Sequence, residues 1–348
     1  MKMETEQATL QIHTPAGKLL RQALATLLIA LLLLEGGLRL AVTSGWMPDP
    51  GPGTTNADLN IKMPMLDALA QLEGGVDCIF LGSSMTNDDV DPEVFASHYG
   101  ELSGTTVTCF NFAVATLTGE IAGGLSRILV ERYHPDLLVY GTSARDYSKE
   151  LGARALKDDG WFRYQLGEWN LTGWLKEYSM LYRTYLKILS DFNPANREYA
   201  ISVRQNTSPY GHFVVHVNVI SLEGQNTIHE EILLKKDFAG LKRLVSLDGA
   251  GVSVVVMEIP VHEAFLPEYV NEKSEDYYRL FFDPATEILT KAGIPFIHTL
   301  TGTRFTAPDE EWADLKHLNN KGSARFSAWL ADEIWQLEQA GVITWGED

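Results

Sequence analysis

The chain has 348 residues, 45% of them hydrophobic and 21% charged, which is typical of a globular protein with one large domain and an appendage. It carries 46 acidic and 28 basic residues, a formal net charge of −18 that disfavours contact with the phosphates of nucleic acids and of anionic lipids. Its two cysteines, Cys78 and Cys109, each lie inside an apolar run, as buried thiols do. We therefore expect neither a nucleic-acid partner nor a disulfide framework.

An apolar segment near the amino terminus, from Leu19 to Val42, is long enough to cross a membrane as a helix. Its 24 residues span about 36 Å as a helix, against a hydrocarbon core of roughly 30 Å. Lys18 and Arg21 lie at its start, so the positive-inside rule places residues 1–18 in the cytoplasm as a short tail. We expect a single-pass membrane protein whose remaining residues lie outside the cytoplasm.

Two charged residues near the end of this segment, Glu35 and Arg39, are four positions apart, so they can neutralise each other at the membrane interface. The alternative to a retained anchor is a cleaved signal peptide, for which residues 41–44 offer small side chains but no A-x-A-like site. Residues 43–59 are rich in proline and glycine, as linkers are. We favour an anchor at 19–42, a linker at 43–59 and a folded domain at 60–340.

Strands and helices alternate along residues 60–340, beginning with an apolar strand from Val76 that ends in Gly82-Ser83-Ser84. Apolar runs of strand length bounded by glycine are typical of central parallel strands. Further strands are expected at Val107–Phe112, Pro135–Tyr140, Val252–Ile259 and Ile294–His298. Helices are expected at Pro64–Leu72, after an Asp91 cap, and at Thr118–Arg132, Pro284–Ala292 and Ser323–Leu337. This alternation predicts an α/β fold with a doubly wound, mainly parallel five-stranded sheet.

Residues 147–247 form an insertion between the third and fourth strands that is rich in Trp and Tyr. Within it, Asn170–Phe192 carries large apolar residues on one helical stripe and requires a partner surface. The aromatic residues can pack a helical cap, line a substrate pocket or seat the domain on the bilayer interface. His212 and His216 alternate with apolar residues but have no acidic or thiol ligands nearby, so we expect no metal site.

Ser84 follows the first strand, at the carboxyl edge where open α/β sheets place their sites. A serine there either caps the next helix or acts as a nucleophile. Near the carboxyl terminus, Asp314 precedes His317 by three residues in a loop before the last helix. A carboxylate so placed fixes the tautomer of the imidazole and stabilises the imidazolium that forms when histidine takes a proton from serine. Alone, an Asp-x-x-His spacing is a weak signal.

Polar residues follow the other strands and are expected at the same sheet edge. They are Asn111 beside Ala113 after the second strand, Ser143, Arg145 and Asp146 after the third, and His262 after the fourth. A strand-end arginine can bind a carboxylate or an acyl oxygen bidentately, although Arg145 and Asp146 also fit a surface pair or a helix start. We take Arg145, Asp146, Asn111 and His262 as candidates for binding substrate.

These blocks, in this order and spacing, resemble the SGNH (GDSL-like) hydrolases over most of Val76–Ile334. The blocks are Gly82-Ser83-Ser84, Asn111-Phe112-Ala113, Gly141-Thr142-Ser143 and Asp314-x-x-His317-Leu318-Asn319-x-x-Gly322. With its amino-terminal anchor, the chain is most similar to the membrane-anchored branch associated with acylation of cell-envelope polysaccharides. The resemblance implies a flavodoxin-like three-layer sandwich, with Ser84 as the nucleophile, His317 as the general base and Asp314 as the residue that orients it.

The resemblance also implies an oxyanion hole made by the N–H groups of Ser84 and Ala113 and by a side chain at the position of Ser143. The family has Gly where Ala113 stands, a change that keeps the N–H in place. It has Asn where Ser143 stands, and losing one oxyanion donor typically costs about 10²–10³ in rate. Ser143 or Arg145 must take over that role if the chain is an active enzyme.

The function implied by the resemblance is that of an extracytoplasmic serine esterase or O-acyltransferase that needs no cofactor. Its substrates would be acyl esters, such as acetyl esters, of an envelope or exported glycan, and a multispanning membrane acyltransferase would be its partner. The alternative is a catalytically impaired SGNH-like binding or assembly component of a polysaccharide-modifying machinery, because a fold does not guarantee an activity and the Asn is missing.

Overall fold

The computed structural model describes residues 16–148, 154–217, 235–249, 251–265, 274–300 and 305–345. Their centre is a parallel five-stranded sheet with the order β2-β1-β3-β4-β5. The strands are β1 (Cys78–Leu81), β2 (Cys109–Asn111), β3 (Leu137–Thr142), β4 (Ser253–Glu258) and β5 (Phe296–Ile297). Each overlaps a strand expected from the sequence, and the order is that of flavodoxin-like doubly wound sheets, so the predicted fold class is confirmed.

Helices account for most of the remaining described residues. The α-helices are α1 (Ala16–Thr43), α2 (Ala57–Glu73), α3 (Ser84–Asp89), α4 (Pro92–Ser103), α5 (Gly119–Tyr133), α6 (Arg154–Lys157), α7 (Gly160–Gln165), α8 (Leu171–Tyr178), α9 (Met180–Asp191), α10 (Pro194–Asn206), α12 (Ala239–Val245), α13 (Ser274–Tyr277), α14 (Asp283–Ala292) and α15 (Asn320–Gln339). Short 3-10 turns are η1 (Ala144–Tyr147), η2 (Glu263–Phe265) and η5 (Asp309–Glu311), and η4 (Tyr278–Phe282) is a π-helical turn.

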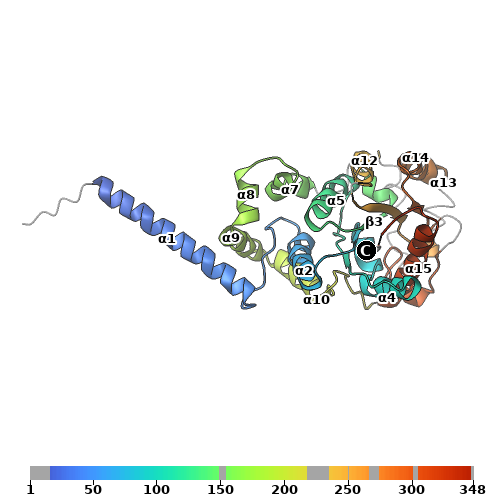
Figure 1. Ribbon diagram of the computed structural model, residues 1–348, viewed down its shortest axis with the longest axis horizontal. Helices are drawn as coiled ribbons and strands as arrows, with labels where there is room; N and C mark the ends of the chain where they lie inside the picture. Colours follow the sequence, from blue (N-terminus) through green and yellow to red (C-terminus); the bar gives the residue numbers. More distant parts are fainter. Residues whose placement is uncertain are drawn as a thin grey trace, which may run out of the picture.

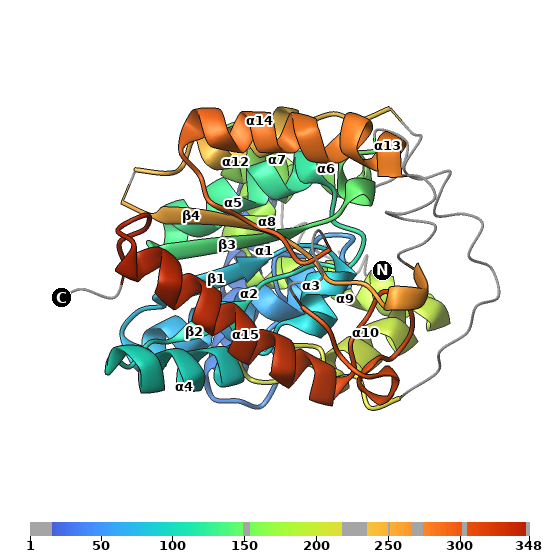
Figure 2. The same cartoon turned by 90° about the vertical axis from the view of Figure 1, so that its right-hand side faces the viewer.

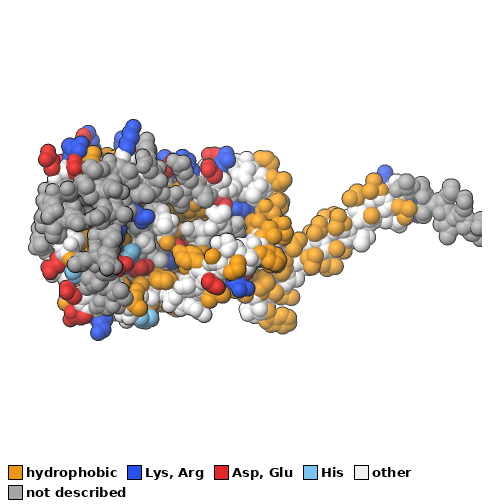
Figure 3. Space-filling model, turned by 180° about the vertical axis from the view of Figure 1, so that it is seen from behind, with side chains coloured by type: hydrophobic (Ala, Val, Ile, Leu, Met, Phe, Trp, Pro, Cys, Tyr) orange, Lys and Arg blue, Asp and Glu red, His pale blue; other side chains and the backbone are white. Residues whose placement is uncertain are grey.

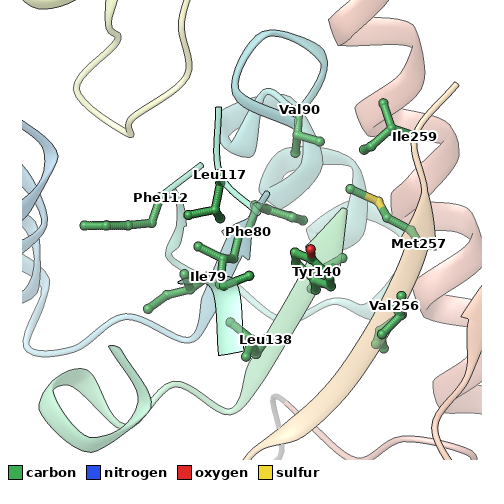
Figure 4. Packing of buried hydrophobic residues seen from close by; sticks show 14 of the residues in the cluster. Ile79, Phe80, Val90, Phe112, Leu117, Leu138, Tyr140, Val256, Met257 and Ile259 are labelled. Carbon is green, nitrogen blue, oxygen red and sulfur yellow. The ribbon is translucent and has the colours of Figure 1, made fainter. Parts of the chain in front are cut away.

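The sheet is covered by helices on both faces, with α5, α12 and α14 on one and α4 and α15 on the other (Figure 2). Between these layers, Ile79, Phe80, Leu138 and Val256 are fully buried, and their side chains pack together in Figure 4. Parallel strands buried on both faces read as continuous apolar runs rather than alternating ones. This is why the sequence predicts them well.

Polar caps fix where several helices begin. The predicted cap of α4 is present, with Asp91 Oδ1 accepting hydrogen bonds from the N–H groups of Glu93 at 3.0 Å and Val94 at 3.3 Å. Helix α2 begins seven residues before the expected Pro64, because the Asn56 side chain accepts from the Leu59 N–H at 2.9 Å and so starts the helix inside the expected linker. Pro64 lies within α2.

The apolar amino-terminal segment lies in a single helix, α1, which extends away from the domain (Figure 1). Among the helices of the described residues, α1 is the one that is long and apolar enough to span a membrane. Its most apolar stretch is not buried by other parts of the chain. The expected pair is present, with Arg39 Nε donating to Glu35 Oε1 at 2.7 Å. Most of the expected cytoplasmic tail, residues 1–15, lies outside the described residues.

The insertion contains α6 to α10 and α12, and residues 149–153 and 218–234 of it lie outside the described residues. The continuous helical stripe expected over Asn170–Phe192 is divided into α8 and α9. The division falls at Ser179, whose Oγ accepts from the Tyr182 N–H at 3.2 Å and so caps the start of α9. A serine side chain at an N-cap accepts a hydrogen bond from a backbone N–H that has no partner within the helix. Ser179 therefore starts α9 instead of continuing α8.

Candidate active site

Ser84 is the first residue of α3, directly after β1, at the carboxyl edge of the sheet (right side of Figure 2). Since β1 lies between β2 and β3, this is the point at which the strand order reverses, where such folds bind ligands. Ser83 occupies the N-cap position of α3, but its side chain makes no capping hydrogen bond. Capping therefore explains neither serine side chain.

Two glycines allow α3 to approach the ends of β1 and β3. A Cβ atom on Gly82 would lie 2.0 Å from Thr86 Oγ1, and one on Gly141 would lie 2.3 Å from the same atom. Both distances are far shorter than van der Waals contact, so any side chain at either position would push the first turn of α3 outward. The position of Ser84 therefore depends on two residues that have no side chain.

Ser84, His317 and Asp314 form one chain of short contacts. His317 Nε2 lies 3.1 Å from Ser84 Oγ, and His317 Nδ1 lies 3.0 and 2.9 Å from the two carboxylate oxygens of Asp314. The Asp314 carboxylate also accepts the backbone N–H groups of Lys316 at 2.7 Å and His317 at 2.9 Å. Because a carboxylate only accepts, Nδ1 carries the proton and Nε2 is left to accept the serine hydroxyl.

The charges around His317 favour a basic imidazole. Burial opposes its protonation, but the hydrogen bond that Nδ1–H donates to Asp314 and the charges of Asp88 and Asp314 outweigh burial, so the pKa of His317 is raised. Burial would raise the pKa of Asp314, but its bonds with the His317 ring and two backbone N–H groups lower it, so this carboxyl is ionised at neutral pH. The Asp314 side chain is 53% exposed and that of His317 is 21% exposed, so water reaches the three hydrogen-bonded side chains from the Asp314 end.

Asp88 is a carboxylate near the site that the sequence reading missed. Burial raises its pKa to about 7, with His317 the largest of the charges that oppose this rise. Asp88 lies four residues after Ser84 in α3, and positions four apart share one face of a helix. A helix predicted over residues 84–89 would have placed Asp88 on the same face as Ser84, and this is the sequence signal that could have identified it.

The loop that carries Asp314 and His317 is held from two sides. Asp89, which is fully buried, accepts the Leu318 N–H at 2.7 Å and so ties the loop to α3. The His262 N–H donates to Leu315 O at 3.0 Å. His262 Nδ1 accepts the Ala264 N–H at 3.0 Å, Nε2 lies 3.1 Å from Asp309 Oδ1, and the ring is buried against Trp312. The ring of His262 therefore supports the loop, and its contact with substrate stays a prediction.

The segment after β2 differs from the expected oxyanion element. The Ala113 N–H donates to Asn111 Oδ1 at 3.0 Å, and both residues are fully buried. Asn111 Nδ2 in turn donates to Thr86 O at 2.8 Å and Val90 O at 2.7 Å. The side chain of Asn111 thus closes a turn on the backbone two residues ahead and occupies the Ala113 N–H. The roles of Ala113 as an oxyanion donor and of Asn111 as a substrate contact stay predictions.

Lys62 of α2 is a further residue that the sequence reading missed. Its Nζ is fully buried and donates to Asn87 Oδ1 at 2.5 Å, Ala113 O at 2.8 Å and Asn111 O at 3.0 Å. Burial lowers its pKa to about 7 against the opposing charges of Asp58 and Asp88. Lys62 thus holds the segment after β2 against α3. Nothing in the local sequence distinguishes it from the exposed lysine of an ordinary helix.

The residues after β3 also turn inward. The Ser143 N–H donates to Asp146 Oδ2 at 2.8 Å, and both residues are buried, so Asp146 shapes this turn. A role of Asp146 in binding substrate stays a prediction. Ser143 Oγ is a buried polar atom that has no hydrogen-bond partner among the described residues. Arg145 is half-buried at the start of η1. The hydroxyl of Ser143 can therefore still donate a hydrogen bond.

The two histidines considered as metal ligands lie in different environments. His212 is buried, with Nε2 3.0 Å from Asp88 O, whereas His216 is exposed. Across the described ranges of the chain, no group of three or more His, Cys, Asp or Glu side chains is arranged to hold a metal ion.

Comparison with known proteins gives little further information. No family model and no curated protein matches the chain. Among solved structures, a lipase/acylhydrolase from Enterococcus faecalis aligns with 75% of this chain and 96% of its own, at 15% identity and a TM-score of 0.35. BT4096, a gut microbial diltiazem-metabolizing enzyme, aligns with 74% of this chain and 46% of its own, at 11% identity and a TM-score of 0.35. The functional argument therefore rests on the site geometry.

Proposed function

We propose that the chain is a membrane-anchored, extracytoplasmic serine ester hydrolase or O-acyltransferase of the SGNH type, acting on acyl esters of an envelope or exported glycan. The observation that carries the proposal is the continuous chain from Ser84 Oγ through the His317 ring to the Asp314 carboxylate. Helix α1 supports the anchor, and the basic residues before its apolar core support a cytoplasmic amino terminus.

In the first half of the reaction, Ser84 Oγ attacks the carbonyl carbon of an acyl ester while His317 Nε2 takes its proton. Asp314 stabilises the imidazolium through Nδ1–H. The tetrahedral intermediate then collapses, the bond to the alkoxy group breaks, and His317 returns the proton to the leaving alcohol. The acyl group is left as an ester on Ser84.

In the second half, water or a sugar hydroxyl attacks this ester, with His317 again accepting the proton and then returning it to Ser84 Oγ. Water as the acceptor gives an esterase, and a glycan hydroxyl gives an O-acyltransferase. The same residues serve both outcomes, and the acceptor that binds decides between them.

A second candidate is a binding component of a glycan-modifying machinery that has lost catalytic power. The observation that favours it is that the Ala113 N–H is already bonded to Asn111 Oδ1, which leaves one backbone donor fewer for an acyl oxyanion. Such a protein would keep glycan binding and its role in the machinery without Ser84.

The deciding experiment uses the full chain in membranes and a fluorophosphonate probe, which reacts with serines activated by a neighbouring base. The native protein should label at Ser84 and release acyl groups from acylated envelope polysaccharide, and Ser84→Ala should abolish both. Ser83→Ala is the matched control, because Ser83 is buried and contacts neither His317 nor Asp314 in the described hydrogen bonds. Lack of labelling at every pH, with complementation by the Ser84→Ala protein, would favour the binding component.

A further inference from the structure

The two helices that follow the aromatic start of the insertion expose apolar residues at helical spacing. On α8 these are Leu171, Trp174 and Tyr178, and on α9 and its C-cap they are Tyr185, Ile188, Leu189 and Phe192. Amphipathic helices of globular domains normally bury such a stripe and expose their polar residues. Here the stripe is the outer surface, with exposures from 43% at Trp174 to 77% at Phe192. We call these seven residues the apolar face.

The apolar face lies beside the end of α1. In Figure 1, α8 and α9 form the side of the domain nearest to α1, and Figure 3 shows hydrophobic side chains gathered where the domain meets that helix. Trp46, three residues after the end of α1, is 89% exposed. Tryptophan and tyrosine prefer the boundary between hydrocarbon and water, where an apolar ring and a polar N–H or O–H are both accommodated.

A polar junction fixes α1 to these helices. Glu35 of α1 accepts the N–H groups of Met180 and Leu181, each at 2.9 Å, and the Ser179 hydroxyl at 3.0 Å. Arg39 pairs with Glu35 and donates to Tyr178 O at the end of α8. Arg39 and Glu35 thereby supply hydrogen-bond partners for a backbone carbonyl at the end of α8 and for backbone N–H groups at the start of α9. The depth of α1 in a membrane therefore sets the depth of α8 and α9.

The length of α1 then brings the bilayer to the domain. From Leu19 to Leu34, before the junction begins, α1 has 16 residues, or about 24 Å, which is several Å less than a hydrocarbon core of roughly 30 Å. A helix of this length that carries a domain tied at Glu35 draws the surface around the junction into the interfacial layer. That surface is the apolar face.

We infer that the apolar face rests in the interfacial layer of the lipid bilayer, so that α1, α8 and α9 together hold the domain in one orientation on the membrane. This inference rests on the proposed membrane anchor. The net charge of −18 disfavours attraction to anionic headgroups as the driving force, so the partner is the apolar and zwitterionic interface itself. Of the three roles considered for the aromatic insertion, this one accounts for the exposed stripe.

The test places nitroxide labels on single cysteines of the full chain in phosphatidylcholine liposomes. Leu171→Cys and Ile188→Cys report on the apolar face, and Glu101→Cys on α4, remote from α1 in Figure 1, is the control. The native Cys78 and Cys109 are buried and free, so they do not compete for label. We expect collisions with oxygen to dominate over collisions with a water-soluble nickel chelate at the first two positions, and the reverse at Glu101→Cys.

Equal access of the nickel chelate at all three positions, in protein that still resists carbonate extraction, would overturn the inference while leaving the anchor intact. Protection of Leu171→Cys and Ile188→Cys from both reagents would also overturn it, because it would mean that protein and not lipid covers the face. Fluorophosphonate labelling of the same liposomes tests the proposed activity separately, and extraction by carbonate would count against the anchor itself.

Discussion

The two halves of the candidate site are built differently. On the base side, Ser84 and the loop of Asp314 and His317 come from opposite ends of the domain and meet in a continuous hydrogen-bonded chain. On the oxyanion side, the Ala113 N–H is bonded to Asn111 Oδ1, and the side chain at position 143 is a serine hydroxyl instead of an amide. The chain is thus organised to move a proton away from Ser84 but less so to stabilise the negative charge that follows.

For the proposed enzyme, the difference predicts which step limits the rate. Ser84 begins α3, and the first N–H groups of a helix have no partner within it, so its amide is the remaining candidate backbone donor for the oxyanion. The hydroxyl of Ser143 is the candidate for the side-chain donor, where the resembled family has an Asn. We expect a slow enzyme whose nucleophile is nevertheless reactive.

Removing the base should have the largest effect. His317→Ala should lower turnover of an acyl ester by roughly 10³–10⁶-fold, because the nucleophile, base and orienting residue act as a unit. Asp314→Asn should cost less, about 10²–10⁴, since that carboxylate is half exposed and partly screened by water. Single-turnover rates with an aryl ester measure both. Equal activity of His317→Ala and the native protein would remove the base side from the mechanism.

Breaking the support under the oxyanion side should unfold the domain more readily. Lys62→Met deletes three hydrogen bonds and leaves Asn87, Asn111 and Ala113 acceptors buried, so we expect a loss of about 3–5 kcal/mol in the free energy of unfolding. Chemical denaturation monitored by tryptophan fluorescence measures it. Lys18→Met, in the exposed part of α1, is the control and should change the unfolding midpoint little.

Restoring the amide donor should strengthen the weaker side. Ser143→Asn should raise turnover by about 10–100-fold, because it adds an N–H donor where the resembled family has one. Ser143→Ala is the paired control and should lower turnover by less than about tenfold, because a single neutral hydroxyl donor is lost. Steady-state kinetics of the two variants with one ester substrate measure the difference. A decrease in both would mean that Ser143 packs the turn and does not face the acyl oxygen.

A pH profile should give the smallest but most specific change. His317 must be neutral to accept a proton, and its pKa is raised, so kcat/KM should increase with pH through a value above the ordinary one for histidine. The pKa of Asp88 is about 7, and its negative charge helps to raise the pKa of His317, whereas the positive charge of Lys316 lowers it. In Asp88→Asn the acid limb should become a single sharper step shifted to lower pH, by up to about one unit. An unchanged profile would show that the Asp88 charge does not reach His317.

The sequence predicted the base side and most of the fold for a common physical reason. Central parallel strands are continuous apolar runs, and their carboxyl ends converge, so Ser84 and the Asp314–His317 loop could be placed together from chain order alone. The split of the Asn170–Phe192 stripe was missed although Ser179 is a cap residue. An apolar stripe continues across such a break, and only the cap marks it.

The oxyanion side could not be read in the same way. Whether a backbone N–H faces the site depends on local dihedral angles and on side chains two or three residues away, as with Asn111 and Ala113 or Asp146 and Ser143. A polar residue at a strand end looks the same in sequence whether it points at substrate or closes a turn. Lys62 shows the same ambiguity for a charged residue on a helix.

The close fit of Thr86 between Gly82 and Gly141 has a consequence for relatives of this chain. A protein that kept Ser84, His317 and Asp314 but carried a side chain at either glycine would present the same reactive groups at a different spacing. Inheritance of the reactive residues is therefore not sufficient for inheritance of the site. A Gly-x-x-x-Thr spacing at the first strand end, with a second Gly at the end of the neighbouring strand, marks in sequence alone the chains in which the nucleophile can sit where it does here.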